Sequence, residues 1–167
     1  MSRLAVIAGV ACWMVAGTAS AQNLIGDKPP LISGTDRAKV VFSIAGVVDS
    51  ATQATYVSCT SLEKTGGKDI HFAVEFFDNG SSANDVAAGD GEEFLSGPGD
   101  TDGISTRAIT GLSTTEIATP PGIAGTGAAR ILSTSTKIIC AAFVVDPTNG
   151  TYLASLPVFK ALKQSGD

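Results

Sequence analysis

Few residues of this chain have side chains suited to catalysis. His71 is the only histidine among 167 residues, and no G-x-S-x-G motif is present, so the usual parts of a serine-hydrolase triad are missing. His71 lies four residues before Glu75 in an alternating segment, and we interpret it as a surface histidine that pairs with Glu75 or with solvent. No phosphate-binding G-x-x-x-x-G-K loop occurs. We therefore predict no catalytic residue and no cofactor-binding residue, and we expect the protein not to be an enzyme.

Acidic residues gather in the segment 81–103, which contains six of the 16 Asp and Glu residues of the chain. Asp90–Glu93 and Asp100–Gly103 each place carboxylates close together beside glycine, and calcium prefers carboxylate oxygens as ligands. Neither stretch matches a complete EF-hand loop, so a solvated acidic loop is the simpler interpretation. Zinc is disfavoured because the chain has one histidine and, once the expected signal peptide with Cys12 is removed, no thiol outside the expected Cys59–Cys140 disulfide. We predict no metal ligand, and calcium binding by 81–103 stays open.

The N-terminus has the pattern of a secretory signal peptide. Arg3 supplies a positive charge, and the 13 residues of Leu4–Ala16 form an apolar stretch that is too short to cross a bilayer. Ala19 and Ala21 then stand at the two positions that a signal peptidase reads. We predict cleavage after Ala21 and an exported protein, either periplasmic or extracellular.

Two cysteines, Cys59 and Cys140, remain in the chain after the expected cleavage. Because an exported chain meets an oxidising compartment, we predict that they form a disulfide. The bond would close a loop of 81 positions, and loop entropy alone gives it roughly 4–5 kcal/mol of stabilisation as an upper value. Free thiols or a metal pair are the alternative for these two residues. Lipid anchoring at Cys12, preceded by Gly9-Val10-Ala11, is the alternative to signal cleavage after Ala21.

The charge balance restricts the partners. The chain has 16 acidic against 11 basic residues and a formal net charge of −5, which disfavours nucleic acid and anionic membrane surfaces. Apart from the signal, no segment is long and apolar enough to span a membrane. We expect one domain that binds an unknown protein or glycan partner.

Segments with a two-residue period predict β-strands. In Lys68–Asp78, every second residue from Ile70 to Phe76 is a large apolar side chain, which predicts the main core face. In Thr136–Asp146, both faces are apolar, and we expect this strand to be covered on both sides or to lie at the centre of a sheet. The predicted strands are 37–48, 54–62, 68–78, 92–95, 104–110, 114–119, one within 125–136, 136–146 and 151–159.

About eight short strands with turn residues between them, and no strong helical segment, predict an all-β fold. We expect an immunoglobulin-like antiparallel β-sandwich with one inter-sheet disulfide, because the cysteines fall on the second and the penultimate strands. The predicted organisation is a signal peptide at 1–21, an extended N-terminal arm at 22–36, the sandwich at 37–160 and a polar tail at 161–167.

Several of these pieces occur together in one family. The strand with Cys59, the run Val74–Asp78, the run Ala129–Cys140, the pair Asp146-Pro147 and a lysine-bearing tail cover about half of the mature chain. With them the chain resembles a family of uncharacterised secreted two-cysteine β-domain proteins of Gram-negative bacteria. The resemblance implies export and a two-cysteine β-domain, and the family has no assigned activity.

The functional hypothesis is a non-enzymatic exported β-sandwich that acts as a binding or surface-structural module. A small secreted hydrolase with an unrecognised carboxylate site is one alternative, because the many acidic residues make some pair of carboxylates inevitable. A fimbrial-type subunit that donates the arm 22–36 is another, although its cysteines usually lie closer together than 81 positions.

Overall fold

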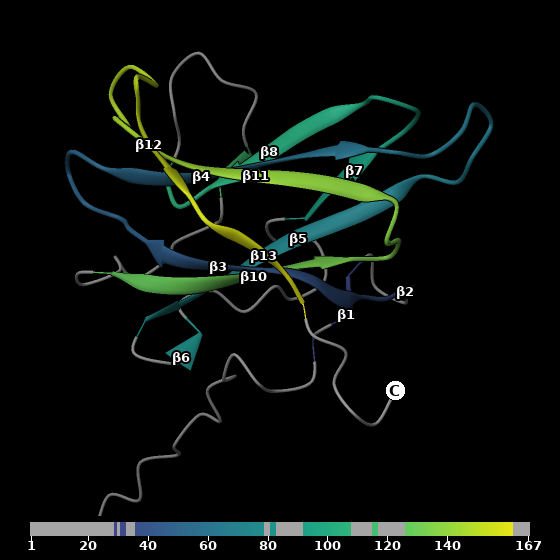
Figure 1. Cartoon of the computed structure of the whole chain (residues 1–167), viewed down its shortest axis with the longest axis horizontal. Helices are drawn as coiled ribbons and strands as arrows, with labels where there is room; N and C mark the ends of the chain where they lie inside the picture. The colour runs from purple at the N-terminus through teal and green to yellow at the C-terminus, as the bar shows by residue number, and fades with distance from the viewer. Residues whose placement is uncertain are drawn as a thin grey trace, which may run out of the picture.

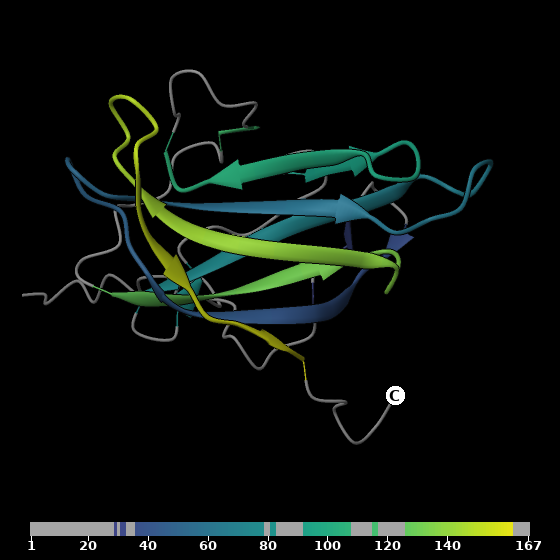
Figure 2. The ribbon, with the colours of Figure 1, turned by 45° about the horizontal axis from the view of Figure 1, so that its top comes forward.

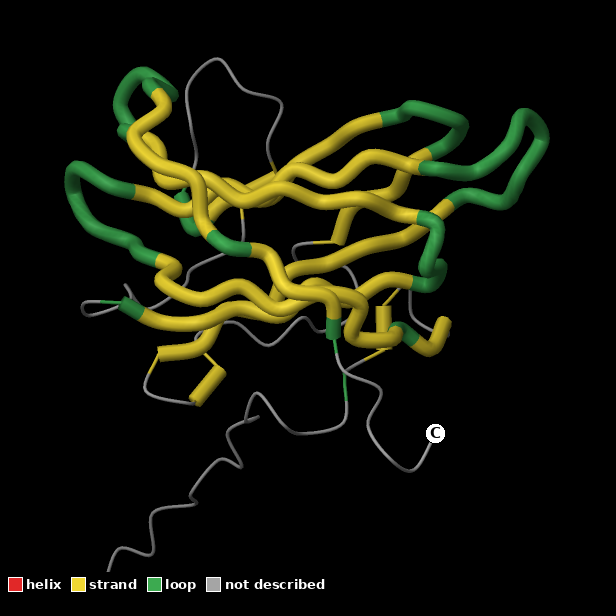
Figure 3. Tube along the Cα trace, viewed as in Figure 1, coloured by secondary structure: helices red, strands yellow, loops and turns green. Residues whose placement is uncertain are grey.

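The computed structural model describes residues 29, 31–32, 36–78, 81–82, 92–107, 115–116 and 126–161. Within these ranges every regular element is a strand, as Figure 3 shows, and nine strands have three or more residues. No helix in the described part of the chain is long and apolar enough to cross a membrane. The strands are β1 Leu31–Ile32, β2 Asp36–Arg37, β3 Lys39–Val47, β4 Ala54–Ser61, β5 Ile70–Asp78, β6 Ser81–Ser82, β7 Glu92–Leu95, β8 Thr101–Ser105, β9 Thr115–Glu116, β10 Gly127–Ser133, β11 Ile138–Val145, β12 Tyr152–Leu156 and β13 Val158–Lys160.

Two sheets lie face to face and form a sandwich (Figure 1). The six-stranded sheet has the order β13-β3-β10-β5, with β6 and β7 both paired to the outer edge of β5. The five-stranded sheet has the order β12-β11-β4-β8-β9, and its β8–β9 pair is the one parallel contact among the described strands. The all-β sandwich prediction is confirmed, whereas the immunoglobulin-like assignment stays a prediction.

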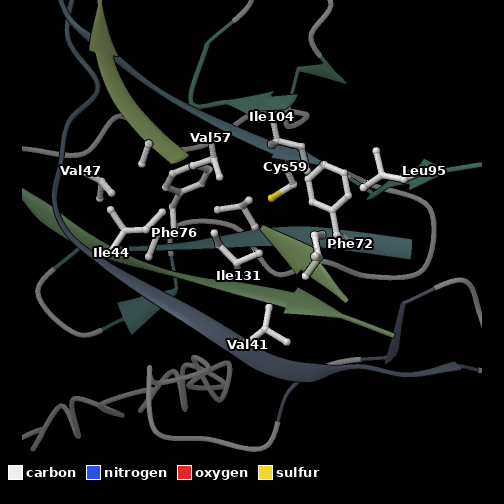
Figure 4. Packing of buried hydrophobic residues seen from close by; sticks show 14 of the residues in the cluster. Val41, Ile44, Val47, Val57, Cys59, Phe72, Phe76, Leu95, Ile104 and Ile131 are labelled. Carbon is white, nitrogen blue, oxygen red and sulfur yellow. The ribbon is translucent and has the colours of Figure 1, made fainter. Parts of the chain in front are cut away.

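The core lies between the sheets and follows the two-residue period of the sequence. Ile70, Phe72, Val74 and Phe76 point inward from β5 and are fully buried, so the predicted core face is confirmed. Figure 4 shows the phenyl rings of Phe72 and Phe76 packed against Val57, Cys59 and Ile104 of the opposite sheet. Burying side chains of this size contributes about 1.5–3 kcal/mol each, which makes this layer the main source of stability.

Both long edges of the sandwich are bridged by short strands. The C-terminal segment runs from β12, paired with β11, to β13, paired with β3, and only Pro157 separates the two strands (Figure 2). Proline suits this corner because it lacks a backbone N–H and so cannot continue a ladder. On the other side, β7 pairs with β5 and contacts β8 of the facing sheet.

The disulfide between Cys59 and Cys140 is present, so the predicted pairing is confirmed. Its location differs from the expectation. The two cysteines are direct register partners on β4 and β11, which are neighbours in the five-stranded sheet, so the bond lies within one sheet and does not join the two. Their Cα atoms are 4.1 Å apart, the spacing of the close, non-hydrogen-bonded pairs in an antiparallel ladder. The immunoglobulin analogy misplaced the bond because strand pairing is not local in the sequence.

Strand β11 is covered on one side over its first half. Ile138 and Ala142 face the core, but Ile139 and Ala141 on the opposite side are exposed. The expectation that both faces of 136–146 are covered is therefore wrong for this half. The second alternative is also not met, since β11 lies one strand in from the sheet edge, between β12 and β4.

The outer face of the six-stranded sheet is buried in its middle, on β5 and β10. Ala73 and Phe77 of β5 and Leu132 of β10 are almost fully inaccessible, and Ile32 of β1 packs on Ala73 and Leu132. Part of the predicted N-terminal arm thus pairs in the β1–β2 hairpin and contributes a core residue. The signal peptide 1–21, most of the arm and most of the tail fall outside the described residues, as do parts of the strands expected at 104–110 and 114–119.

Candidate functional site

The two residues that the sequence joined as a surface pair each have a contact with a neighbouring strand. The His71 ring stacks on Phe94 of the neighbouring strand, with ring centroids 6.0 Å apart and planes inclined by 30°. The His71 backbone N–H donates to the Thr134 hydroxyl at 3.0 Å. Glu75 is buried and forms an ion pair with Arg130. Glu75 is therefore not a surface residue, because it pairs with a cation directly across the sheet. A pairing of His71 with Glu75 stays a prediction.

Arg130 and Glu75 form a buried ion pair on β10 and β5, where they are register partners. The Arg130 Nε donates to Glu75 Oε2 at 2.8 Å, and Nη2 lies 2.7 Å from the same oxygen. The guanidinium also stacks 5.2 Å from the ring centre of Phe77. A buried pair of this kind holds a structure in register, since removing one partner leaves a charge without compensation in a dry interior. We assign it a structural role.

Sequence reasoning missed this pair although a signal for it exists. Glu75 stands alone in the apolar run FAVEFF and Arg130 alone in AARIL. Single charges of opposite sign in the middle of two apolar strands indicate that the strands are neighbours and that the charges meet.

A second polar cluster ties the β3–β4 hairpin to the end of β8. Asp49 is buried, and its carboxylate Oδ1 lies 3.2 Å from the Nε of Arg107. Burial raises the pKa of Asp49, and the charge and hydrogen bond of Arg107 oppose that rise. The Thr55 hydroxyl accepts from the Val48 N–H at 2.7 Å, and Thr106 Oγ1 accepts from the Thr55 N–H at 3.1 Å. The partner of this carboxylate is a cation, whereas glycoside hydrolysis needs two carboxylates across a cleft.

In the described part of the acidic segment, the carboxylate of Asp100 closes a turn. Asp100 Oδ2 accepts hydrogen bonds from the Ser96 N–H at 2.7 Å and from the Ser96 hydroxyl at 3.2 Å, and its Oδ1 accepts from the Thr101 N–H. The side chain thereby closes the β7–β8 turn, where Gly99 has a φ of 77° that favours glycine. Among the described residues, no group of three or more His, Cys, Asp and Glu is placed to hold a metal ion. Asp90 and Gly91 lie outside the described residues.

The outer face of the five-stranded sheet has a different character from these clusters. Ile139 is 56% exposed on β11, and Leu62, which follows β4, is exposed to a similar extent. The same face carries Phe143, which contacts Tyr152 edge-to-face with ring centroids 6.0 Å apart. By the alternation of the strands, this open face consists of Tyr56, Ser58, Thr60, Leu62, Thr101, Gly103, Ile139, Ala141 and Phe143, with Tyr152 beside Phe143.

Tyr56 lies across Gly103 on the open face. A Cβ at Gly103 would overlap the phenol oxygen and ring of Tyr56, so the glycine is what allows the ring to lie against strand β8. Burial raises the pKa of Tyr56, the charge of Asp102 adds to the rise, and a hydrogen bond with Ser58 opposes it. The ring fills the surface above Gly103 and continues the apolar stripe from β11 onto β8.

No family model, curated protein or solved structure matches the chain. The resemblance to a two-cysteine secreted family therefore stays a prediction. Among the described residues, exposed apolar side chains gather on the open face of the five-stranded sheet, at Leu62, Ile139 and Tyr152.

Proposed function

We propose that the chain is an exported, non-enzymatic β-sandwich that acts as a binding module, and that the open face is its contact surface for a partner protein. One observation carries the proposal. Ile139 and Leu62 are more than half exposed close together on the five-stranded sheet, whereas the middle of the other sheet's outer face, on β5 and β10, is buried and its exposed Phe94 and Phe159 lie apart on the edge strands β7 and β13. Large exposed apolar side chains that gather on one face are typical of protein interfaces.

The chemistry of the open face favours a protein over a glycan. Sugar recognition combines a stacking platform with several fixed polar groups that are available to the ligand hydroxyls. On the open face, the Thr60 and Thr101 hydroxyls bond to each other at 2.8 Å, and the Tyr152 hydroxyl bonds to that of Ser155 at 3.0 Å. These polar groups satisfy one another, and aliphatic surface remains at Ile139 and Leu62.

Two further features support export. The Cys59–Cys140 disulfide is of the kind that persists in oxidising compartments, and the N-terminal sequence has the pattern of a signal peptide. A net charge of −5 keeps such a protein away from anionic surfaces, so its contacts depend on uncharged patches such as the open face.

Site-specific photo-crosslinking in the source cell tests the proposal. A photoreactive phenylalanine analogue replaces Ile139 in one variant and Phe94 in the control, since Phe94 is equally exposed at 55% but lies on the six-stranded sheet. We expect a discrete adduct at 139 that protease removes, and none at 94. Equal adducts at both positions, or none at 139, would overturn the proposal. An adduct that resists protease and yields to glycosidases would assign the surface to a glycan.

A further inference from the structure

Strand β12 forms the outer edge of the five-stranded sheet. It pairs with β11 on one side, and no other described strand pairs with its second side. The four residues Tyr152 to Ser155 are all exposed, Tyr152 by 58% and Leu153 by 46%. An edge strand carries a row of backbone N–H and C=O groups, and the ligand that fits such a row is another extended strand.

The direction of the backbone groups on β12 follows from the disulfide. Because Cys140 and Cys59 form a close, non-hydrogen-bonded pair at 4.1 Å, the N–H and C=O of Cys140 point away from β4, toward β12. Two and four residues on, the backbone groups of Ala142 and Val144 point the same way, toward their register partners Leu156 and Ala154. The intervening pair is Phe143 with Ser155, so the N–H and C=O of Ser155 point outward, away from β11.

Strand β12 carries neither a charged side chain nor, among the described strands, a covering strand on its outer edge; a register shift lies between Tyr152 and Ala154 and Pro157 follows its end, so the regular edge is centred on Ser155. The run from Thr151 to Phe159 contains no charged residue. By contrast, β13 ends in Lys160, β9 contains Glu116, and the outer edge of β5 is occupied by β6 and β7. Charged side chains and covering elements are common protections of sheet edges, and among the described strands β12 is the longest edge without them.

We propose that β12 pairs with β12 of a second copy of this chain, antiparallel and across a two-fold axis near Ser155. The charge distribution favours pairing of two copies at β12. Two molecules of net charge −5 repel each other where their acidic surfaces meet, and this repulsion is weakest at an uncharged edge. An antiparallel pair of identical strands is also self-complementary, as a two-fold interface requires.

The pairing joins two five-stranded sheets into one continuous sheet. A two-fold axis perpendicular to that sheet places both open faces on the same side. Phe143, the register partner of Ser155, then faces the same side as its counterpart in the second copy, with the two β12 strands between them. The dimer presents a contact surface twice as wide as that of one copy. The inference therefore extends the proposed function, but the pairing of β12 does not depend on that function.

Analytical ultracentrifugation of the oxidised protein from micromolar to millimolar concentration tests this pairing. Ser155→Pro removes the outward N–H at a position where an edge strand tolerates proline. Ser155→Ala is the matched control, since both variants lose the 3.0 Å hydroxyl contact with Tyr152 and only the proline loses the N–H. We expect the wild type and Ser155→Ala to approach twice the monomer mass, and Ser155→Pro to stay monomeric. A wild type that is monomeric throughout, or a Ser155→Pro variant that dimerises like the alanine control, would overturn the proposal.

A second variant, which changes only a side chain, tests the pairing even if Ser155→Pro fails to fold. Leu153→Lys leaves every backbone group in place and adds a charge to the edge, so it should weaken dimerisation by at least about tenfold, and more at low salt than at high salt. Dimerisation unaffected by Leu153→Lys would contradict the proposal even if Ser155→Pro failed to fold. The crosslinking test distinguishes the two proposals: an adduct at 139 in the Ser155→Pro background supports partner binding alone, and an adduct of twice the chain mass assigns the open face to self-association.

Discussion

On the six-stranded sheet, the outward-pointing side chains of β5 are buried: Ala73, Glu75 and Phe77 each expose 1% or less. On the five-stranded sheet, the outward-pointing side chains in the first half of β11 are open: Ile139 is more than half exposed and Ala141 is exposed, whereas Val145 near the end of the strand is buried. Both strands are apolar runs in the sequence, so hydrophobicity alone does not separate them. The two strands differ in whether other residues cover their outward-pointing side chains. We therefore assign a stabilising role to the six-stranded sheet and partner binding to the five-stranded sheet.

The buried ion pair should give the largest effect on stability. Glu75→Gln leaves the Arg130 charge in a dry interior, and we expect a loss of about 3–5 kcal/mol in the free energy of unfolding. Denaturant titration measures it. The double variant Glu75→Leu with Arg130→Met is the control, because replacing both charges with apolar groups of similar size should recover most of the loss. A loss below about 1 kcal/mol in the single variant would contradict the burial of this ion pair.

Loss of the disulfide should have the second largest effect on the free energy of unfolding. Replacing Cys59 and Cys140 together with alanine should cost about 2–5 kcal/mol, since the bond closes a loop of 81 positions in the unfolded chain. Thermal unfolding of the oxidised protein, of the same protein after reduction and of the double variant measures it. The reduced protein and the variant should agree. Equal melting temperatures in all three samples would show that the bond adds nothing to this sheet.

Gly103→Ala should cost less, about 1–3 kcal/mol, because its Cβ overlaps the Tyr56 ring and the ring must move. The double variant with Tyr56→Ala removes the clash, so the effect of Gly103→Ala should shrink in that background. A double-mutant cycle of melting curves measures the coupling. Additive effects would mean that the ring does not lie across Gly103.

Asp49 should give the smallest stability effect. Because burial raises its pKa in the folded state, the favourable contribution of its neutral form is present below the unfolded pKa and is lost as the pH rises through the folded pKa. Asp49→Asn should therefore match the wild type at low pH and be more stable by less than about 1 kcal/mol at neutral pH. Urea titrations across this pH range measure it. A variant that is less stable at neutral pH would show that the Arg107 contact outweighs burial.

The sequence predicted what depends on local patterns. The alternation from Ile70 to Phe76 identified a core face because the side-chain direction reverses at every residue of a strand. The Cys59–Cys140 pairing was predictable because only two cysteines were expected in the mature chain. Glu92–Leu95 was also predicted with its observed bounds as an edge strand.

Features that depend on which strands are neighbours were not predictable. The disulfide lies within one sheet because β4 and β11 pair directly across 81 positions, and the Arg130–Glu75 contact joins residues 55 positions apart. The apolar run 136–146 showed that side chains prefer burial but not whether anything covers them. The open face follows from the missing cover over Ile139, which no local pattern encodes.

The most direct test of the account is the crosslinking yield at position 139 relative to position 94, measured in the presence and absence of Leu62→Asp. Leu62 and Ile139 share the open face, while Phe94 lies on the other sheet. The account predicts a protease-sensitive adduct at 139 that Leu62→Asp abolishes, with no adduct at 94 in either background. An adduct at 94 that matches the one at 139, or an adduct at 139 that persists with Leu62→Asp, would contradict it.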